Sequence, residues 1–286
     1  MLNERKAKLI SIFEDTMDFI SEEEDLFDKV EYSKRETEMI PADEYYELAE
    51  PGRAGSILVS KDRTLEAAMR YAFSDEHSEK KIAVLNFASA TNPGGGVEDG
   101  SSAQEESLCR CSTLFPVLQQ ASLRHEFYEP HRRARNPLNN DDVIYSPEIV
   151  IIKTDTEYPE RMEMDDWCVV DVITCAAPNL RKRTNKYSNG RAVQNVSVTP
   201  DELYDLQLNR AQHILNVAAG NDVEVLILGA FGCGAFENDP KIVAQAWKDA
   251  LQEYAGYFDV VEFAVYTSPY DQKNYKAFVD VFEEEE

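Results

Sequence analysis

Hydrophobic and polar positions follow two periods along this chain. Short apolar runs such as KIAVLNF (81–87) and VVEFAVYT (260–267) are typical of strands buried on both faces of a sheet. Six runs are predicted strands: 56–60, 81–87, 143–154, 166–178, 223–234 and 260–267. Segments with helical spacing lie between them, namely 62–73, a helix from about residue 200, and 239–256. Strands that alternate with helices predict an α/β fold around a mostly parallel sheet.

Residues that favour helix starts precede these helical segments. Asp62 lies near the expected cap of the helix over 62–73. The run Thr199-Pro200-Asp201-Glu202 combines an N-cap, a proline at the first helical position and a capping-box glutamate. Asp239 and Pro240 have the corresponding positions before the next helix, which Gly256 is expected to end. The helical assignments therefore rest on both periodicity and local chemistry.

The first 50 residues show a different pattern. Residues 1–30 carry apolar side chains at helical spacing, at Leu9, Ile10, Phe13, Met17 and Ile20. Residues 31–55 look irregular, because IPADEYYELAEPGRAG holds two prolines and two glycines. We expect 1–50 to form an acidic helical N-terminal extension and 51–286 to form one domain, since no long linker divides 56–286.

The chain is strongly acidic, with 29 Lys and Arg against 54 Asp and Glu, a net charge of −25 and a pI of about 4.5. Such a charge favours solubility and disfavours nonspecific binding to nucleic acids or membranes. Solvated surface or adaptation to salt is the favoured explanation of the acidic charge. The stretch RKRTNKYSNGR (181–191) is the exception, with five basic residues and no acidic one. It would suit contact with a polyanion, or it is a solvated loop.

Cysteine usage and apolar run length indicate the compartment. No apolar run approaches the roughly 20 residues that cross a bilayer, and the N-terminus lacks the apolar core of a signal peptide. The cysteines, at positions 109, 111, 168, 175 and 233, are odd in number and form no CxxC pair, so we expect reduced thiols. We therefore expect a cytoplasmic protein without a membrane partner.

Two glycine-rich turns directly follow predicted buried strands. NFASATNPGGG ends at Gly96 and LGAFGCGAF contains Gly232 and Gly234. Ligands of open α/β sheets collect at the carboxyl ends of strands, and glycines there let backbone N–H groups approach an anion. Neither turn is a P-loop or a GxGxxG fingerprint. The alternative is that the glycines only serve tight turns, but two such turns favour a ligand with more than one phosphate.

The run Gln104-Glu105-Glu106 follows the first of these turns. Ser102 and Glu105 have capping-box spacing, so we expect Glu105 to cap the helix that starts there. Glu106 has no such task and lies about 100° further round the helix, towards the glycine turn. A glutamate in that position can protonate a glycosidic leaving oxygen and then activate water. Two acids that simply favour a helix start are the alternative.

These motifs resemble the microbial-type poly(ADP-ribose) glycohydrolases, a divergent branch of the macrodomain fold. Their signature is GGG, six to eight residues, then QEE, and this chain has Gly94-Gly95-Gly96, seven residues and Gln104-Glu105-Glu106. The surrounding segments LNFASATNPGGG, ESLCRCSTL, CAAPN (175–179) and LGAFGCGAFENDP (228–240) are also similar. The resemblance covers roughly 55–270 and leaves out residues 1–50 and the acidic tail.

The resemblance implies a three-layer α/β/α macrodomain-like mixed sheet that binds ADP-ribose at the strand ends. It implies that Glu106 is the acid/base, that Glu105 holds a ribose hydroxyl and that Gln104 supports the site. It also implies that the first turn, Gly94, Gly95 and Gly96, contacts the terminal ribose and its phosphate. The second turn would wrap the diphosphate with Gly232, Cys233, Gly234 and Ala235, and Phe236 would stack on a ring of the ligand. The implied enzyme hydrolyses the ribose–ribose O-glycosidic bond of poly(ADP-ribose) on modified proteins.

One position departs from the related enzymes. Ser89 stands where they often have an asparagine; Asn86 and Asn92 flank it, and Asn86 is the candidate for the ribose contact. No cofactor or metal is expected, because the four histidines, at 77, 125, 131 and 213, match no metal-ligand spacing. Cys233 has no histidine near it in sequence and is interpreted as a small apolar filler rather than a nucleophile.

Two other functions remain open on the sequence. A non-hydrolytic ADP-ribose reader would keep both glycine turns but would not need two carboxylates beside the sugar. A hydrolase of mono-ADP-ribose on protein or nucleic acid would use the same residues. A nucleic acid is expected as a partner only if it is such an ADP-ribosylated substrate.

Overall fold

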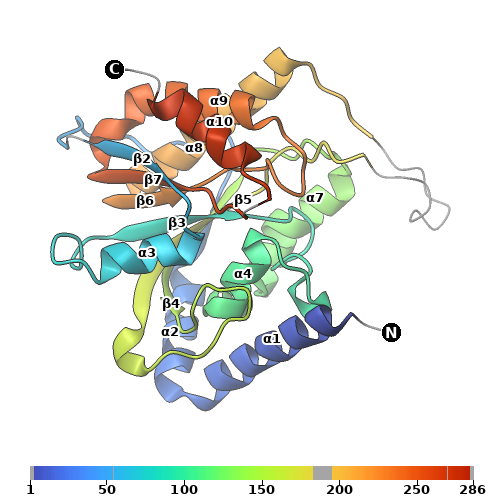
Figure 1. Ribbon diagram of the computed structural model, residues 1–286, viewed down its shortest axis with the longest axis vertical. Coiled ribbons are helices and arrows are strands. Elements are labelled where there is room, and N and C mark those ends of the chain that lie inside the picture. Colours follow the sequence, from blue (N-terminus) through green and yellow to red (C-terminus); the bar gives the residue numbers. More distant parts are fainter. Residues whose placement is uncertain (1–2, 54, 183–194, 269, 284–286) are drawn as a thin grey trace.

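The computed structural model describes residues 3–53, 55–182, 195–268 and 270–283. Within these residues it forms one seven-stranded mixed sheet in the order β1-β4-β5-β3-β6-β7-β2 (Figure 1). The strands are β1 (Glu38–Ile40), β2 (Ser56–Ser60), β3 (Ile82–Phe87), β4 (Val143–Ile151), β5 (Cys168–Cys175), β6 (Val225–Leu228) and β7 (Val260–Ala264). The pairs from β5 through β3, β6 and β7 to β2 are parallel, and β4 pairs antiparallel with both β5 and β1. The predicted mostly parallel sheet is confirmed.

Helices cover both faces of the sheet. The regular helices are α1 (Glu4–Glu22), α2 (Glu24–Glu36), α3 (Thr64–Ala72), α4 (Gln104–Cys111), α5 (Leu114–Leu118), α6 (Ala121–Leu123), α7 (Glu129–Ala134), α8 (Pro200–Gly220), α9 (Pro240–Tyr254) and α10 (Lys273–Glu283). Shorter turns are η1 (Val97–Asp99), the π-helical η2 (Arg124–Tyr128), η3 (Met164–Asp166) and η5 (Ala255–Tyr257). Helices α8, α9 and α10 lie on one face, and α1 to α4 lie on the other (Figure 1). The three-layer α/β/α fold is confirmed.

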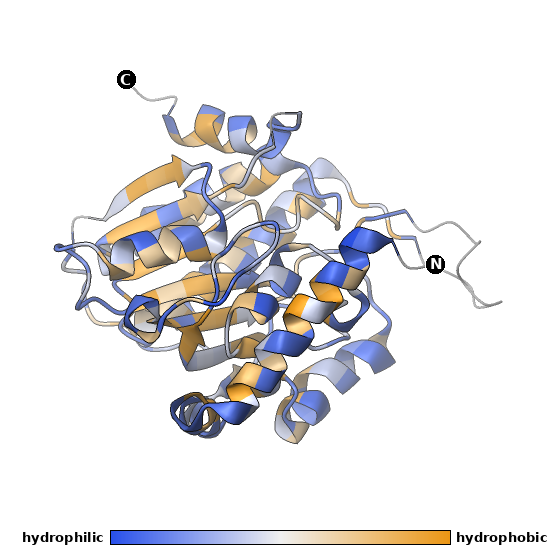
Figure 2. Cartoon of the chain, turned by 60° about the horizontal axis from the view of Figure 1, so that its bottom comes forward, coloured by the Kyte–Doolittle hydropathy of each residue, from blue (hydrophilic) through white to orange (hydrophobic). Residues whose placement is uncertain are grey.

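Strand β3 shows why the sheet has a core on each side. Ile82 and Val84 pack into the cluster beneath α1 to α4, whereas Ala83 and Leu85 pack into the cluster beneath α8 and α9. Successive side chains of a strand point to opposite faces, so a continuous apolar run serves both layers. In Figure 2 the strands are largely hydrophobic, and α1, in front of them, is striped with hydrophilic and hydrophobic positions.

The helix starts were predicted well where the cap is local. Thr199 caps α8 by accepting from Glu202 N–H at 3.2 Å, and the capping box is complete. Asp239 accepts from Lys241 N–H before α9. The helix expected over 62–73 starts later, at Thr64, with Arg63 rather than Asp62 at the cap.

The N-terminal prediction needs correction. Residues 1–30 were expected to hold one helix, but α1 ends at Glu22 and α2 begins at Glu24, because Glu23 is extended. The region 31–55, expected to be irregular, contains the end of α2 and strand β1. The helices between 114 and 134 and helix α10 were not predicted. Most of the basic stretch 181–191 lies outside the described residues.

Helices α1 and α2 are attached to the sheet by polar contacts as well as by apolar packing. The buried Lys153 Nζ donates to Ile12 O at 2.7 Å and pairs with Asp15 at 2.7 Å. On α2, Ser33 Oγ donates to Glu148 O at 3.1 Å. None of the described helices is both long and apolar enough to cross a membrane.

Candidate active site

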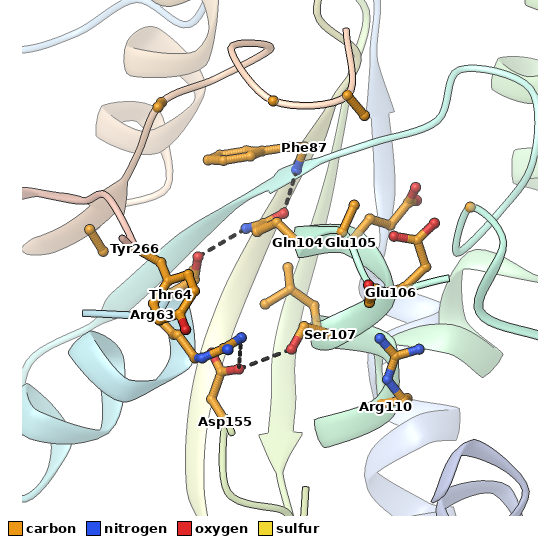
Figure 3. Close-up of a pocket in the computed structure, with 18 of the residues that line it drawn as sticks. Arg63, Thr64, Phe87, Gln104, Glu105, Glu106, Ser107, Arg110, Asp155 and Tyr266 are labelled. Carbon is orange, nitrogen blue, oxygen red and sulfur yellow. Dashed lines mark hydrogen bonds and ion pairs between the residues drawn. The ribbon is translucent and has the colours of Figure 1, made fainter. Parts of the chain in front are cut away.

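A cavity of about 630 Å³ opens at the carboxyl ends of the parallel strands, where the sequence placed the ligand site. The turn after β3 contributes Gly95, and the turn after β6 contributes Gly232 and Gly234. Because β3 and β6 are neighbours in the sheet, the two turns face one site. Figure 3 shows Glu105 and Glu106 rising from the start of α4 towards the space between these turns. Residues of both glycine turns therefore border one cavity.

The first glycine turn lies against carboxylates of its own chain. Gly94 and Gly95 have positive φ angles of 71° and 62°. A Cβ on Gly95 would lie 2.5 Å from Glu106 Oε1 and 2.9 Å from Glu105 Oε2. Gly96 N–H donates to Glu106 Oε1 at 2.9 Å. The glycines therefore allow the backbone to approach both carboxylates.

The predicted capping role of Glu105 is wrong. Helix α4 begins at Gln104, Ala103 is at the N-cap position, and no side chain caps it. Glu105 Oε2 instead accepts from Ser89 N–H at 2.7 Å, in the loop that leaves β3. The side chain is 3% exposed, and this burial raises the pKa of Glu105 well above its ordinary value. A contact between distant segments has replaced the local one.

Glu106 faces the glycine turn, as predicted. One oxygen is held by the Gly96 N–H, and the other, Oε2, is buried without a hydrogen-bond partner among the described residues. The side chain is 8% exposed and lines the cavity. A carboxyl group with one oxygen fixed and the other free is suited to exchange a proton with a ligand.

Gln104 joins α4 to the open edge of β3. Its Oε1 accepts from Phe87 N–H at 2.9 Å, and its Nε2 donates to Leu85 O at 2.7 Å and to Thr64 Oγ1 at 3.1 Å (Figure 3). The ladder between β3 and β6 has ended at Val84, so the amide takes the hydrogen bonds that a neighbouring strand would have made. This places the two carboxylates relative to the sheet.

Not all candidate residues reach the cavity wall. Asn86 is fully buried and its Nδ2 donates to Thr174 Oγ1 at 3.2 Å, so it lies behind the wall, whereas Ser89 lines the cavity. Gly94 and Gly96 shape the turn, but Gly95 supplies its exposed surface. Cys233 also lies off the lining, and burial raises the pKa of its thiol, which fits the filler interpretation.

The second turn presents backbone and small side chains. Gly232, Gly234, Ala235 and Phe236 all line the cavity. Gly232 has a φ of 78°, and a Cβ there would lie 2.6 Å from Ala177 Cβ. The buried Asn238 secures the turn, because its Nδ2 donates to Pro178 O at 2.6 Å and to Gly232 O at 3.0 Å.

Several lining residues were not identified from the sequence. They come from segments far apart in the chain: Arg5, Leu9, Arg63, Thr64, Arg110, Asp155 and Tyr266. Arg63 lies over the Tyr266 ring at 4.0 Å from its centroid. Asp155 accepts from Leu65 N–H and Ser107 Oγ, and burial raises its pKa. Arg63 and Thr64 follow the carboxyl end of β2 and Tyr266 follows that of β7, so the strand-end rule could have found these three.

Among the described residues, no group of three or more His, Cys, Asp or Glu side chains is placed to hold an ion. All five cysteines are free thiols.

Comparison with known proteins gives one family. Residues 12–154 match the model of the microbial-type PARG catalytic domain, where PARG is poly(ADP-ribose) glycohydrolase. The matched segment starts inside the region that the sequence resemblance had left out. No curated protein matches the chain.

Solved structures of poly(ADP-ribose) glycohydrolases are similar over most of the chain. The enzyme from Thermomonospora curvata has 29% identity and a TM-score of 0.77, covering 96% of this chain and 99% of its own. Its complex with the inhibitor ADP-HPD has 30% identity with the same coverage and TM-score. The enzyme from Deinococcus radiodurans in complex with ADP-ribose has 31% identity and a TM-score of 0.72, covering 89% and 97%.

Proposed function

Because the chain belongs to the microbial-type poly(ADP-ribose) glycohydrolase family, we propose that it releases ADP-ribose from poly(ADP-ribose) by hydrolysing the ribose–ribose O-glycosidic bond, with Glu106 as the general acid/base. One observation carries the proposal: in a cavity at the strand ends, Glu106 has one oxygen fixed by Gly96 N–H and the other free. A reader that only binds would not need this arrangement.

The chemistry uses one carboxyl group twice. Glu106 donates its proton to the ribose oxygen of the leaving unit while the glycosidic C–O bond breaks, and positive charge develops on the sugar. The resulting carboxylate takes a proton from the water that attacks the anomeric carbon, which regenerates the acid. Because the side chain is 8% exposed, bulk water does not compete freely for this proton.

Glu105 and Gln104 support this step. Burial raises the pKa of Glu105, so the group is suited to donate a hydrogen bond to a ribose hydroxyl, and its Oε1 has no partner among the described residues. Gln104 keeps α4 in register with β3 through the bonds to Phe87 and Leu85. Both residues act on geometry rather than on the breaking bond.

The second turn is proposed to bind the diphosphate. Its lining of Gly232, Gly234 and Ala235 leaves room for a phosphate against the backbone, and Phe236 offers a ring face. Similar enzymes have structures in complex with ADP-ribose and with the inhibitor ADP-HPD, which supports ADP-ribose as the ligand. Cys233 packs behind the turn, and Gly94, Gly96 and Asn86 lie around the ribose end.

The physiological setting is also a proposal. We assign the polymer to modified proteins of the cytoplasm, in keeping with five free thiols. Residues 1–50 serve as an extension to the domain of 51–286, and α1 walls the cavity through Arg5 and Leu9.

The test is release of ADP-ribose from purified poly(ADP-ribose) by the native protein and by Glu106→Gln. We expect the substitution to lower turnover by about a thousandfold, within the range for loss of an acid/base. Calorimetry of ADP-ribose binding should give similar affinities for both proteins. Glu98→Gln, at an exposed position in η1, is the matched control and should keep full activity. If both proteins bind ADP-ribose and neither releases it from polymer, the proposal fails and mono-ADP-ribosylated substrates come next.

A further inference from the structure

Arg110 differs from the other buried cations of the described chain. Three lysine or arginine side chains are buried there: Lys153 at 1%, Arg210 at 1% and Arg110 at 2% exposure. Lys153 and Arg210 each have a carboxylate partner at 2.7 Å. Arg110 has no carboxylate of the described residues within ion-pair distance, and its guanidinium donates to the backbone oxygen of Ser101 at 2.6 Å. Burying a charge without a partner is unfavourable, so this charge calls for an explanation.

The position of Arg110 on α4 suggests that its charge acts on Glu106. Arg110 follows Glu106 by four residues, so the two side chains share one face of the helix. Both line the cavity, and Figure 3 shows the Arg110 guanidinium extending from α4 towards the level of Glu106. Burial lowers the pKa of Arg110, and the negative charge of Glu106 is among the charges that counter this. Arginine nevertheless keeps its proton.

Arg110 is held on two sides. Its Nη1 bonds Ser101 O, and Ser101 N–H in turn donates to Gly96 O at 3.0 Å, in the turn that holds Glu106. Its own backbone oxygen accepts from Thr16 Oγ1 of α1 at 2.6 Å. The guanidinium is therefore tied to the glycine turn, and the backbone of Arg110 is tied to the N-terminal helix.

We propose that Arg110 is a positioning residue whose fixed charge controls the ionisation of Glu106 during the reaction. The inference rests on the proposed function of Glu106. When Glu106 gives its proton to the leaving oxygen, it becomes a carboxylate in a buried site, and the cation one helical turn away stabilises that carboxylate. The water that attacks the sugar then returns a proton to Glu106, and Arg110 itself exchanges none.

The other charged groups around this pair do not replace Arg110. Burial raises the pKa of the Cys109 and Cys111 thiols and of Glu105, so these groups tend to be neutral. Arg5 of α1 is about half exposed and pairs with Glu157 at 3.2 Å, so solvent screens it. The remaining titratable groups nearby are Tyr128, which is buried behind Glu105 with a raised pKa, the buried Asp155, and the exposed Glu98 and Asp99 of η1.

The test compares pH–rate profiles of the full chain. Arg110→Gln removes the charge but keeps a donor for Ser101 O, and Arg110→Lys keeps a charge. We expect Arg110→Gln to move the limb that reports ionisation of the catalytic carboxyl about 0.5 to 1 pH unit higher and to lower kcat by at most the corresponding factor, about three- to tenfold at pH 7. Arg110→Lys should leave that limb in place. Affinity for ADP-ribose should change less than about threefold in both.

Arg210→Met is the control for a purely structural effect. It also removes a buried cation, but one that is paired with Asp141 outside the cavity, so it should lower thermal stability without moving the profile. If Arg110→Gln does not fold, Arg110→Met provides the same neutral comparison. An unshifted profile in the neutral variant, or a loss of ADP-ribose affinity equal to the loss of kcat, would overturn the inference. Failure of the native protein to release ADP-ribose would instead sink the proposed function.

Discussion

The turns after β3 and β6 look alike in sequence but have different structures. Each follows a buried strand, contains at least one glycine with positive φ and reaches the same cavity. In the turn after β3, backbone N–H groups bond to side chains of the protein itself: Gly96 N–H donates to Glu106 and Ser89 N–H donates to Glu105. The turn after β6 is fixed from behind by Asn238 and presents small residues to the cavity.

The difference indicates a division of labour. The first turn uses its backbone N–H groups to hold two carboxylates in fixed positions. The second turn leaves its backbone facing the cavity, which suits the binding of a diphosphate. The glycines of the first turn make room for protein carboxylates, whereas the second turn leaves space that we propose for the diphosphate. The residues that follow each glycine run decide which purpose applies.

The sharpest way to break this comparison is to add one methyl group to each turn. Gly95→Ala would place a Cβ with φ 62° within 2.5 Å of Glu106 Oε1, so we expect displacement of the carboxylates. A shift of that kind should cost at least about a hundredfold in kcat. Gly234→Ala meets no protein atom within 4 Å but enters the space proposed for the phosphate, so it should weaken ADP-ribose binding and raise KM while kcat changes less than about twofold. Steady-state kinetics on the polymer measures both, and equal effects would remove the distinction between the turns.

A second prediction separates binding from chemistry. Asn238→Ala removes the amide that joins the second turn to Pro178 O and Gly232 O, so that turn should loosen. We expect ADP-ribose affinity to fall about tenfold while kcat at saturation changes less than about threefold. Calorimetry and saturation kinetics distinguish the two. A variant with full affinity and a low kcat would show that the second turn takes part in the chemistry.

Gln207→Met is the graded control for Asn238. Gln207 Nε2 donates to Asn238 Oδ1 at 2.9 Å, so its loss leaves both bonds from Asn238 to the turn in place. The effect on ADP-ribose affinity should therefore be smaller than that of Asn238→Ala. An equal or larger effect would place the anchor of the turn on α8 rather than on Asn238.

The sequence was sufficient for features with local causes. The apolar run of β3, the capping box of α8 and the glycine turns each depend on a few consecutive residues. The orientation of Glu106 also followed, because it depends only on helical geometry after the turn. A sheet with neighbouring parallel strands then brings both turns together without further information.

Features with distant causes were missed. Ser102 and Glu105 had capping-box spacing, but the Ser89 N–H offered Glu105 a buried partner that sequence spacing does not show. Helix α1 was recognised as amphipathic, yet its contribution to the cavity depends on contacts with Arg110 and Lys153. Arg110 was not singled out in the sequence, because a basic residue in the last turn of a helix is common. Tertiary contacts, not local propensity, determine where these residues lie.

The smallest predicted effect is on the thermal stability of the protein, through the buried carboxyl group of Glu105 beside the first turn. Burial raises the pKa of Glu105 in the folded protein, whereas the unfolded chain ionises near the ordinary value of about 4.3. Folding then takes up a proton, so the native protein loses stability as pH rises from the unfolded value towards the folded one. Glu105→Gln does not titrate. It should raise the melting temperature by a few degrees at pH 8, and this gain should vanish near pH 4.

Thermal unfolding across this pH range, with Glu98→Gln as an exposed control, measures the effect. The control should show no pH-dependent gain. A constant gain for Glu105→Gln at every pH would mean that Glu105 is ionised in the free protein and that packing alone explains the change. A pH-dependent gain together with lost activity would show that the first turn keeps a destabilising carboxyl group for function. The residues of the second turn that line the cavity include no carboxylate, so this pH-dependent loss of stability does not arise from them.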